Sequence, residues 1–480
     1  MVFSSITFLF YFLPIVFIVY YLFSFSRVLQ NAWLLFASLV FYAWGEPVYV
    51  LIMIGSIIVN WLLGLLVHFC KEEAARKGFL IAACVANLGV LGFYKYTGFV
   101  VENINSILGE ELLPIPEIRL PIGISFFTFQ AMSYVIDVYR KKAEVQKNIF
   151  YLGLYIAFFP QLVAGPIVRY TTVQKQIEGR KSNWNMVSAG VCRFAEGFMK
   201  KILLANNLAV VADRIFELTV NGSTVVAVPV MLAWLGAIAY MFQLYYDFSA
   251  YSDMAIGLGM MFGFTFPENF RYPFVSKSIK EFMARWHISL ATWFNQYVYK
   301  PLGGGQSGNQ DRMIRNLFIV WLLTGIWHGA SWNFIWWGIY FFVFVVFENV
   351  IQIEQIEGHN VLRHVYVVFV VAIAMVIFRC ETNPQLILYM SDLFGLAGNG
   401  FYSPTAIMFL KEYGIVLVAA IIFALPMREY VEARLETSAG TGLIKGVYHV
   451  CYFIGMMALM VFCVAVLAKG GYNPFIYFNF

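Results

Sequence analysis

Long apolar runs separated by short polar segments dominate this chain. The first three are residues 6–23, 32–44 and 48–69, and none of them contains Asp, Glu, Lys or Arg. A helix needs about 20 apolar residues to cross a hydrocarbon core of about 30 Å. The runs therefore predict membrane-spanning helices. Continued along the chain, the pattern predicts roughly ten or eleven spans in total.

Basic residues indicate how these spans are oriented. Arg27 follows the first run, and the basic segments 71–78 and 140–147 follow the third run and the run at 121–139. Because cytoplasmic loops are enriched in Lys and Arg, these segments are expected inside and the amino terminus outside. A fourth span is expected at residues 79–94, and the acidic stretch 95–120 after it is expected to be an external loop.

Three segments do not fit simple spans. Residues 149–168 are long enough to cross, but the Phe159-Pro160 and Gly165-Pro166 pairs favour a segment that dips in and returns to the same side. Residues 187–218 and 276–300 are too charged to cross and are expected to form interfacial amphipathic helices. Residues 301–315 are expected to form a Gly-rich polar loop. Later spans are expected at 225–246, 365–378, 413–425 and 447–468.

Residues 317–347 are the most unusual stretch. They contain no Asp, Glu, Lys or Arg, and their one histidine is His328. At about 1.5 Å per residue the stretch is too long for one upright helix and too short for two full spans. Gly329-Ala330-Ser331 therefore predicts a break between two short helices, with His328 at membrane depth.

Composition supports a polytopic membrane protein. The chain is 61% hydrophobic and 12% charged, whereas soluble domains carry about 25% charged residues. The net charge of +5 therefore reports membrane orientation and does not indicate a nucleic-acid partner. The six cysteines occur singly and are interpreted as small buried hydrophobes. No internal repeat or soluble domain is evident, so we expect one all-α membrane domain over residues 1–480.

Two histidines are the candidate catalytic residues. His328 lies in the apolar stretch, and His287 lies in the amphipathic segment that could fold toward it. A desolvated imidazole stays neutral near pH 7 and can accept a hydroxyl proton, which suits acyl transfer to an alcohol. Both could instead be structural histidines in the core, each hydrogen-bonded to a carbonyl group. Asp247 and Asp253 could either line a polar tunnel or pair structurally, and no metal site is expected because no zinc-type ligand set occurs.

Several motifs resemble the membrane-bound O-acyltransferase superfamily, and within it the branch of alginate O-acetyltransferase membrane subunits. The motifs are RWHISLATWFNQYVYKPLGG, LTGIWHGASWNFIWWG, FFPQLVAGPIVRY, YYDFSAYSDMAIGLGMMFGF, FPENFRYPF and NPFIYFNF. Asn295-Gln296 stands where relatives usually have Arg-Asp, a change that bears on partner docking or acceptor choice.

The resemblance implies a fold of spanning, re-entrant and interfacial helices around a central tunnel. It implies that His328 is the catalytic histidine and His287 the second active-site histidine. Acetyl-CoA would enter from the cytoplasm as acyl donor. An extracytoplasmic SGNH-hydrolase-like partner would complete transfer to a polysaccharide outside a bacterial cell membrane.

Two alternatives stay open. One is a D-alanyl transfer protein of teichoic acid modification, which would take its acyl group from a D-alanyl carrier protein. The other is a transporter or flippase, because buried Asp and His residues also serve proton relays. The absence of an evident inverted repeat argues against the transporter.

Overall fold

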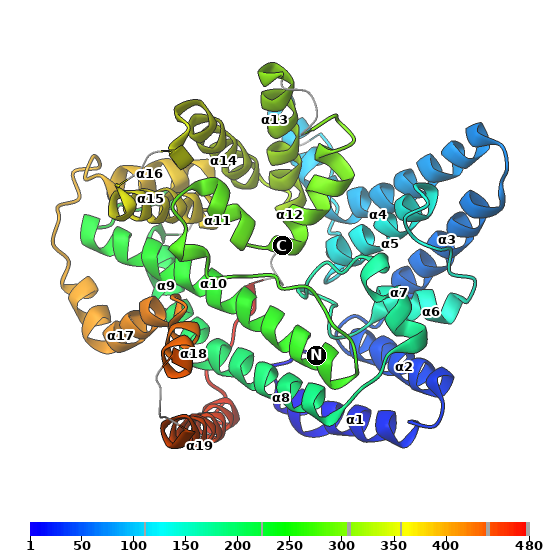
Figure 1. The fold of residues 1–480 in the computed structure, drawn as a ribbon. Helices are drawn as coiled ribbons and strands as arrows, with labels where there is room; N and C mark the ends of the chain where they lie inside the picture. Colours follow the sequence, from blue (N-terminus) through cyan, green and yellow to red (C-terminus); the bar gives the residue numbers. More distant parts are fainter. Residues whose placement is uncertain (110–111, 222–223, 305–308, 356–357, 438–441, 477–480) are drawn as a thin grey trace. The chain divides into compact units, whose positions relative to one another are not determined.

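The computed structural model is mostly helical, with very little strand among the described residues, which confirms the predicted all-α class (Figure 1). It describes residues 1–480 except 110–111, 222–223, 305–308, 356–357, 438–441 and 477–480. Within that part of the chain, the strands β1 (Val220–Asn221) and β2 (Thr224–Val225) form one antiparallel hairpin. Seven described helices are long and apolar enough to cross a membrane: α2 (Arg27–Gly45), α3 (Val50–Phe69), α4 (Glu73–Leu108), α14 (Trp332–Ile351), α15 (Asn360–Arg379), α17 (Pro404–Phe423) and residues Lys445–Ala468 of α19 (Gly442–Ala468). The count of ten or eleven spans stays a prediction.

The chain forms two compact units, of which the first contains residues 1–194 and 251–268. Its elements are η1 (Phe8–Phe12), α1 (Leu13–Leu22), α2 (Arg27–Gly45), α3 (Val50–Phe69), α4 (Glu73–Leu108), α5 (Ile124–Tyr139), α6 (Ile149–Ala157), α7 (Tyr170–Gly179) and most of α8 (Trp184–Met199). Helix α3 packs against α4 and α5. The amides of Asn60 and Asn87 hydrogen-bond each other between α3 and α4, and such pairs satisfy polar groups between membrane helices.

Helix α4 is longer than the sequence pattern predicts. The expected external loop at residues 95–120 begins only after Leu108, so Lys95 and Glu102 lie in the helix. The helix continues because no proline interrupts it. It ends at Gly109, whose φ of 75° gives the left-handed cap that glycine adopts without strain.

The predicted break in the segment 149–168 is present. Helix α6 ends at Ala157, a series of turns follows, and α7 begins at Tyr170. Arg180, after α7, is buried and donates hydrogen bonds to Asn31 Oδ1 at 2.7 Å and to the Phe262 carbonyl at 3.0 Å. A buried guanidinium needs such acceptors to offset its desolvation, so these contacts hold this irregular part of the first unit.

The second unit contains residues 195–250 and 269–480. Helices α8 and α10 (Val230–Met261) contribute to both units. The other elements are η2 (Lys200–Ala205), α9 (Asn206–Leu218), η3 (Pro273–Val275), α11 (Ile279–Arg285), α12 (Ile288–Phe294), η4 (Asn295–Tyr299), α13 (Gln310–His328), α14 (Trp332–Ile351), η5 (Ile353–Gln355), α15 (Asn360–Arg379), α16 (Asn383–Leu393), α17 (Pro404–Phe423), α18 (Met427–Thr437) and α19 (Gly442–Ala468). Its core joins apolar faces of α9, α10, α14, α15 and α17.

The predicted break at Gly329–Ser331 separates α13 from α14, and these helices form the most extensive pair in the second unit. The expectation that both helices are short is wrong. Helix α13 begins at Gln310, inside the predicted polar loop, because the Asn309 side chain caps the backbone N–H of Arg312 at 3.1 Å. Each helix therefore has about the length of a full span, 19 and 20 residues.

Small residues let α13 and α14 approach closely. A Cβ atom on Gly325 would lie 2.4 Å from the Phe334 carbonyl oxygen, and one on Gly338 would lie 2.5 Å from the Trp321 carbonyl oxygen. Contacts under 3.0 Å are not tolerated by real Cβ atoms. Glycine at these two positions thus sets the spacing of the hairpin that carries His328.

Candidate active site

His287 lies at a sharp turn between α11 and α12. Its φ of 45° and ψ of 52° place it in the left-handed region, which is uncommon for a residue with a side chain. The predicted amphipathic segment 276–300 is therefore divided into α11, α12 and η4. Strain of this kind persists only where surrounding contacts fix the backbone, and it is concentrated at functional sites.

Contacts from Asn269 fix this turn. The Ile288 N–H donates to the Asn269 backbone carbonyl at 2.9 Å. The Asn269 side-chain oxygen accepts from the Ser289 N–H at 3.2 Å and from the Ser289 hydroxyl at 2.8 Å. His287 Nδ1 lies 3.2 Å from the same oxygen. One buried asparagine thus contacts three consecutive residues of the turn.

Helix α11, which precedes the turn, is held by Glu348 of α14. The two Glu348 carboxylate oxygens accept from the Ile279 N–H at 2.6 Å and from the Lys280 N–H at 3.0 Å. These donors are the first N–H groups of α11, which have no partner within the helix, and a carboxylate there also interacts favourably with the helix dipole. The contact fixes α11 against the hairpin that bears His328.

His328 is the last residue of α13 and is 8% exposed. Aromatic rings surround its imidazole: the ring centroids of Trp337, Trp327 and Phe378 lie 4.8, 5.1 and 5.3 Å away. His287 contacts a ring of the same cluster, with its centroid 6.1 Å from that of Trp327. The structure therefore brings the two predicted histidines into one aromatic cluster.

Both histidines line one cavity of about 240 Å³. Its walls come from α11, α12, η4, α13 and α14. They consist of Met283, Trp286, His287, Leu290, Ala291, Phe294, Asn295, Tyr299, Leu317, Val320, Trp321, Thr324, His328 and Trp337. The lining is mostly apolar with few polar groups, as is typical of small-molecule sites. Asn295, one of the two positions at which the motif was expected to differ from relatives, belongs to this wall.

The surroundings of His287 lower the pKa of its imidazole. Burial lowers the pKa of His287 well below its ordinary value, and the nearby His328 imidazole lowers it further. Both causes disfavour the charged form. Burial and His328 therefore favour the neutral imidazole, in which one ring nitrogen carries a lone pair.

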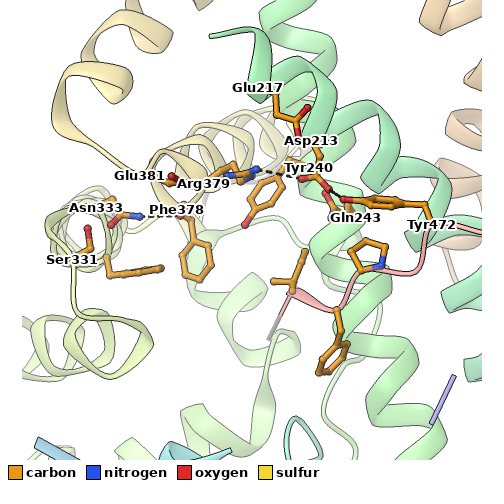
Figure 2. A pocket seen from close by; sticks show the side chains of 14 residues that line it. Asp213, Glu217, Tyr240, Gln243, Ser331, Asn333, Phe378, Arg379, Glu381 and Tyr472 are labelled. Atoms are coloured by element: carbon orange, nitrogen blue, oxygen red, sulfur yellow. Dashed lines mark hydrogen bonds and ion pairs between the residues drawn. The ribbon is translucent and has the colours of Figure 1, made fainter. Parts of the chain in front are cut away.

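A second cavity of about 500 Å³ lies in the same unit (Figure 2). Its polar side chains include Asp213, Arg379 and Tyr472: Arg379 pairs with Asp213 at 3.3 Å, and the Tyr472 hydroxyl donates to Asp213 at 2.8 Å. Phe378 also lines this cavity, and its ring packs against His328. The His328 cluster therefore contributes to the walls of two cavities of different polarity.

The two carboxylates whose roles were open both have ion-pair partners. Asp247 of α10 lies 2.6 Å from Lys201 Nζ, and both side chains are buried. Its other oxygen accepts from the Ile476 N–H at 3.0 Å. In the first unit, Asp253 pairs with Arg193 at 2.7 Å. These contacts favour the structural interpretation of both residues.

The remaining histidines lie elsewhere. His364 Nδ1 lies 2.9 Å from the Ser276 carbonyl, and His68 is in the last turn of α3. His359 is at the N-cap position of α15 without a side-chain capping hydrogen bond, and His449 lies in α19. Among the described residues, no group of three or more His, Cys, Asp or Glu side chains could hold a metal ion.

Sequence reasoning did not single out Asn269, Trp337 or Phe378. Asn269 lies 18 residues from His287 in sequence, and no periodicity connects the two. The one sequence feature that pointed to Asn269 was its place within the motif FPENFRYPF. Trp337 and Phe378 look like ordinary core aromatics in apolar helices, and only the folded chain brings them to His328.

Comparisons with known proteins agree with this architecture. A model of the membrane-bound O-acyltransferase family matches residues 77–391. A probable alginate O-acetylase of Pseudomonas aeruginosa is 40% identical over 92% of this chain and 84% of its own length. A peptidoglycan O-acetyltransferase of Helicobacter pylori is 34% identical over 71% of this chain and 68% of its own. A teichoic acid D-alanyltransferase of Bacillus subtilis is 26% identical over 57% of this chain and 71% of its own.

The chain therefore belongs to the membrane-bound O-acyltransferase family. It is a multi-pass membrane protein and an O-acyltransferase, as the sequence motifs predicted.

Proposed function

We propose that this protein transfers an acetyl group from cytoplasmic acetyl-CoA toward hydroxyl groups of an extracellular polysaccharide, with His328 as the general base and His287 in support. The observation that carries the proposal is the one cavity that both buried imidazoles line. The similarity to polysaccharide O-acetylases supports the acetyl donor and the polysaccharide acceptor.

The chemistry is a balanced acyl exchange. A hydroxyl oxygen attacks the thioester carbonyl, a C–O bond forms, and the C–S bond to coenzyme A breaks. His328 accepts the hydroxyl proton and returns it to the departing thiolate, so the products are an O-acetyl ester and free coenzyme A. The aromatic rings packed around His328 favour this route because they would limit the access of water, which hydrolyses the thioester.

The two cavities suit two reactants of different character. The mostly apolar cavity at His287 fits the acetyl thioester end of the donor, and the cavity at Arg379 has polar groups that could contact a hydroxylated acceptor. A tunnel that joins them at His328 would let a donor and an acceptor approach from opposite sides of the membrane.

The proposed function also requires a particular membrane, an orientation in it and a partner protein. The protein would lie in a bacterial plasma or inner membrane with its amino terminus outside, as the distribution of Lys and Arg favours. An extracytoplasmic SGNH-hydrolase-like protein would receive the acetyl group and pass it to the polysaccharide, in alginate synthesis or a related exopolysaccharide pathway.

The acyl donor separates this proposal from D-alanyl transfer. Purified protein, reconstituted in lipid vesicles together with the extracytoplasmic partner, should be incubated in parallel with radiolabelled acetyl-CoA and with a D-alanyl carrier protein, each with alginate oligosaccharide as the hydroxyl probe. We expect labelled oligosaccharide and free coenzyme A with acetyl-CoA alone. Acyl transfer from the carrier protein alone would overturn the acetyl assignment and favour the second candidate, which the similarity to teichoic acid D-alanyltransferases supports more weakly.

A further inference from the structure

The contacts around Asn269 determine which nitrogen of His287 carries the proton. The Ser289 backbone N–H can act only as a donor, and it lies 3.2 Å from one side-chain atom of Asn269. That atom must therefore be the amide oxygen, because an NH₂ group there would place donor against donor. The assignment does not depend on a choice between the two orientations of the amide.

The same oxygen faces His287. Nδ1 lies 3.2 Å from it, and an oxygen acceptor requires a donor on the other side. Nδ1 of the neutral imidazole therefore carries the hydrogen, and Nε2 carries the lone pair. In enzymes, the partner of one ring nitrogen commonly sets the state of the other in this way.

We propose that Asn269 is a positioning residue that holds His287 as the Nδ1–H tautomer, so that His287 offers a hydrogen-bond acceptor at Nε2. This inference rests on the proposed function and makes one part of it more specific. His287 would orient or deprotonate a hydroxyl through Nε2, and it would not donate a hydrogen bond to the developing oxyanion from that atom.

Burial and backbone geometry support the inference. Asn269 is fully buried and His287 is 3% exposed, so water does not readily replace the contact. The left-handed backbone of His287 is fixed by the Ile288 hydrogen bond to the Asn269 carbonyl. The rings of Phe248 and Phe270 pack on the imidazole, and the ionisable group that acts on it is His328 at the end of α13.

Two substitutions of Asn269 separate positioning from folding. Asn269→Leu removes the acceptor, so both tautomers of His287 become populated, and kcat should fall about 10- to 100-fold with KM for acetyl-CoA little changed. This fall in kcat is smaller than the fall on losing a general base, which is about 10²–10⁴-fold. Asn269→Asp keeps an oxygen acceptor and should retain kcat at high pH. Its negative charge stabilises the imidazolium, so the acidic limb of the pH–rate profile should move up by about 1–3 pH units.

Ser289→Ala is the matched control. It removes another hydrogen bond to the same oxygen but leaves the Nδ1 contact. It therefore reports how much of an effect comes from loosening the turn, and its acidic limb should stay at the wild-type pH. All variants would be compared at equal amounts of folded protein and of the extracytoplasmic partner, with acetyl-CoA as donor and alginate oligosaccharide as acceptor.

The outcomes distinguish this inference from the proposed function. If His287→Ala is inactive while Asn269→Leu has wild-type kcat and Asn269→Asp has the wild-type pH profile, the tautomer assignment is wrong and the proposed site stands. If Asn269→Leu and Ser289→Ala lose activity equally, Asn269 acts only in folding. Full activity of both His287→Ala and His328→Ala would contradict the proposed site itself.

Discussion

His287 illustrates how much one residue can depend on its neighbours. Its backbone is left-handed, its imidazole is buried, and its Nδ1 faces an oxygen of Asn269. None of these features favours a histidine for stability, since the backbone conformation is costly and burial disfavours the charged form. The arrangement is explained more readily by a chemical role than by packing.

The lowered pKa of His287 predicts a specific dependence of stability on pH. Below about pH 6.5 the unfolded chain binds a proton at this histidine that the folded chain does not bind. The unfolded state then binds more protons, so the free energy of unfolding falls as the pH falls, by up to about 1.4 kcal/mol per pH unit.

Thermal unfolding in detergent between pH 7 and pH 5 measures this effect. The wild-type midpoint should fall more steeply with acidification than that of His287→Gln, which has no group to protonate. Parallel curves for the two proteins would show that His287 titrates normally in the folded state.

The Lys201–Asp247 pair is a second residue-scale feature with an energetic consequence. Lys201 also donates to the Pro474 carbonyl, and Asp247 accepts from the Ile476 N–H. The pair therefore anchors the segment 474–476, which lines the larger cavity. A buried charge without its partner costs several kcal/mol.

We predict that Asp247→Asn lowers the free energy of unfolding by about 3–5 kcal/mol, because Lys201 stays buried without a counter-charge. The double variant Lys201→Met, Asp247→Leu removes both charges and should recover part of that loss. Chemical denaturation of the three proteins provides the measurement. A double variant that is less stable than Asp247→Asn would show that the contacts to residues 474–476 dominate over charge pairing.

At the scale of elements, the α13–α14 hairpin is organised by close glycine contacts. Gly325 and Gly338 allow the helix backbones to meet, and Gly329 lies where a Cβ atom would be 2.1 Å from the Phe334 ring. Because His328 ends α13, the spacing of the hairpin also sets the position of the imidazole.

Gly325→Ala should therefore destabilise the protein by about 1–3 kcal/mol, as overpacked cores do, and should lower acyl transfer through displacement of His328. Gly414→Ala in α17 is the control, because nothing lies within 4 Å of its Cβ position. Alanine there should be neutral or stabilising by up to about 1 kcal/mol. Unfolding midpoints and transfer rates report both effects, and equal behaviour of the two variants would refute the packing argument.

Local signals account for the elements that the sequence predicted well. Apolar runs correctly located the long helices, and Gly329–Ser331 correctly marked the break before α14. Helix ends were predicted less well, because α4 continues through Lys95 and Glu102, and α13 starts in a stretch that looks polar. Charged residues are compatible with a helix that extends beyond the membrane core, and hydropathy does not report where such a helix ends.

For the whole molecule, the sequence predicted that two histidines share one site but not what surrounds them. His287 and His328 are 41 residues apart, and their shared cavity depends on a turn held by Asn269 and on α11 held by Glu348. These are tertiary contacts between distant segments, so no local pattern reveals them. The interpretation of residues 1–480 as a single domain stays a prediction, and the description of two compact units does not test it.

The central claim is that His328 performs the acyl transfer, and one measurement tests it most directly. Radiolabel transfer from acetyl-CoA to alginate oligosaccharide should be compared between the wild type, His328→Ala and His449→Ala, at equal amounts in lipid vesicles that also contain the extracytoplasmic partner. His449 is exposed on α19 and lies outside both cavities, so its variant controls for loss of a histidine. The account predicts wild-type transfer by His449→Ala and a loss of about 10²–10⁴-fold for His328→Ala. Wild-type transfer by a folded His328→Ala protein would contradict it.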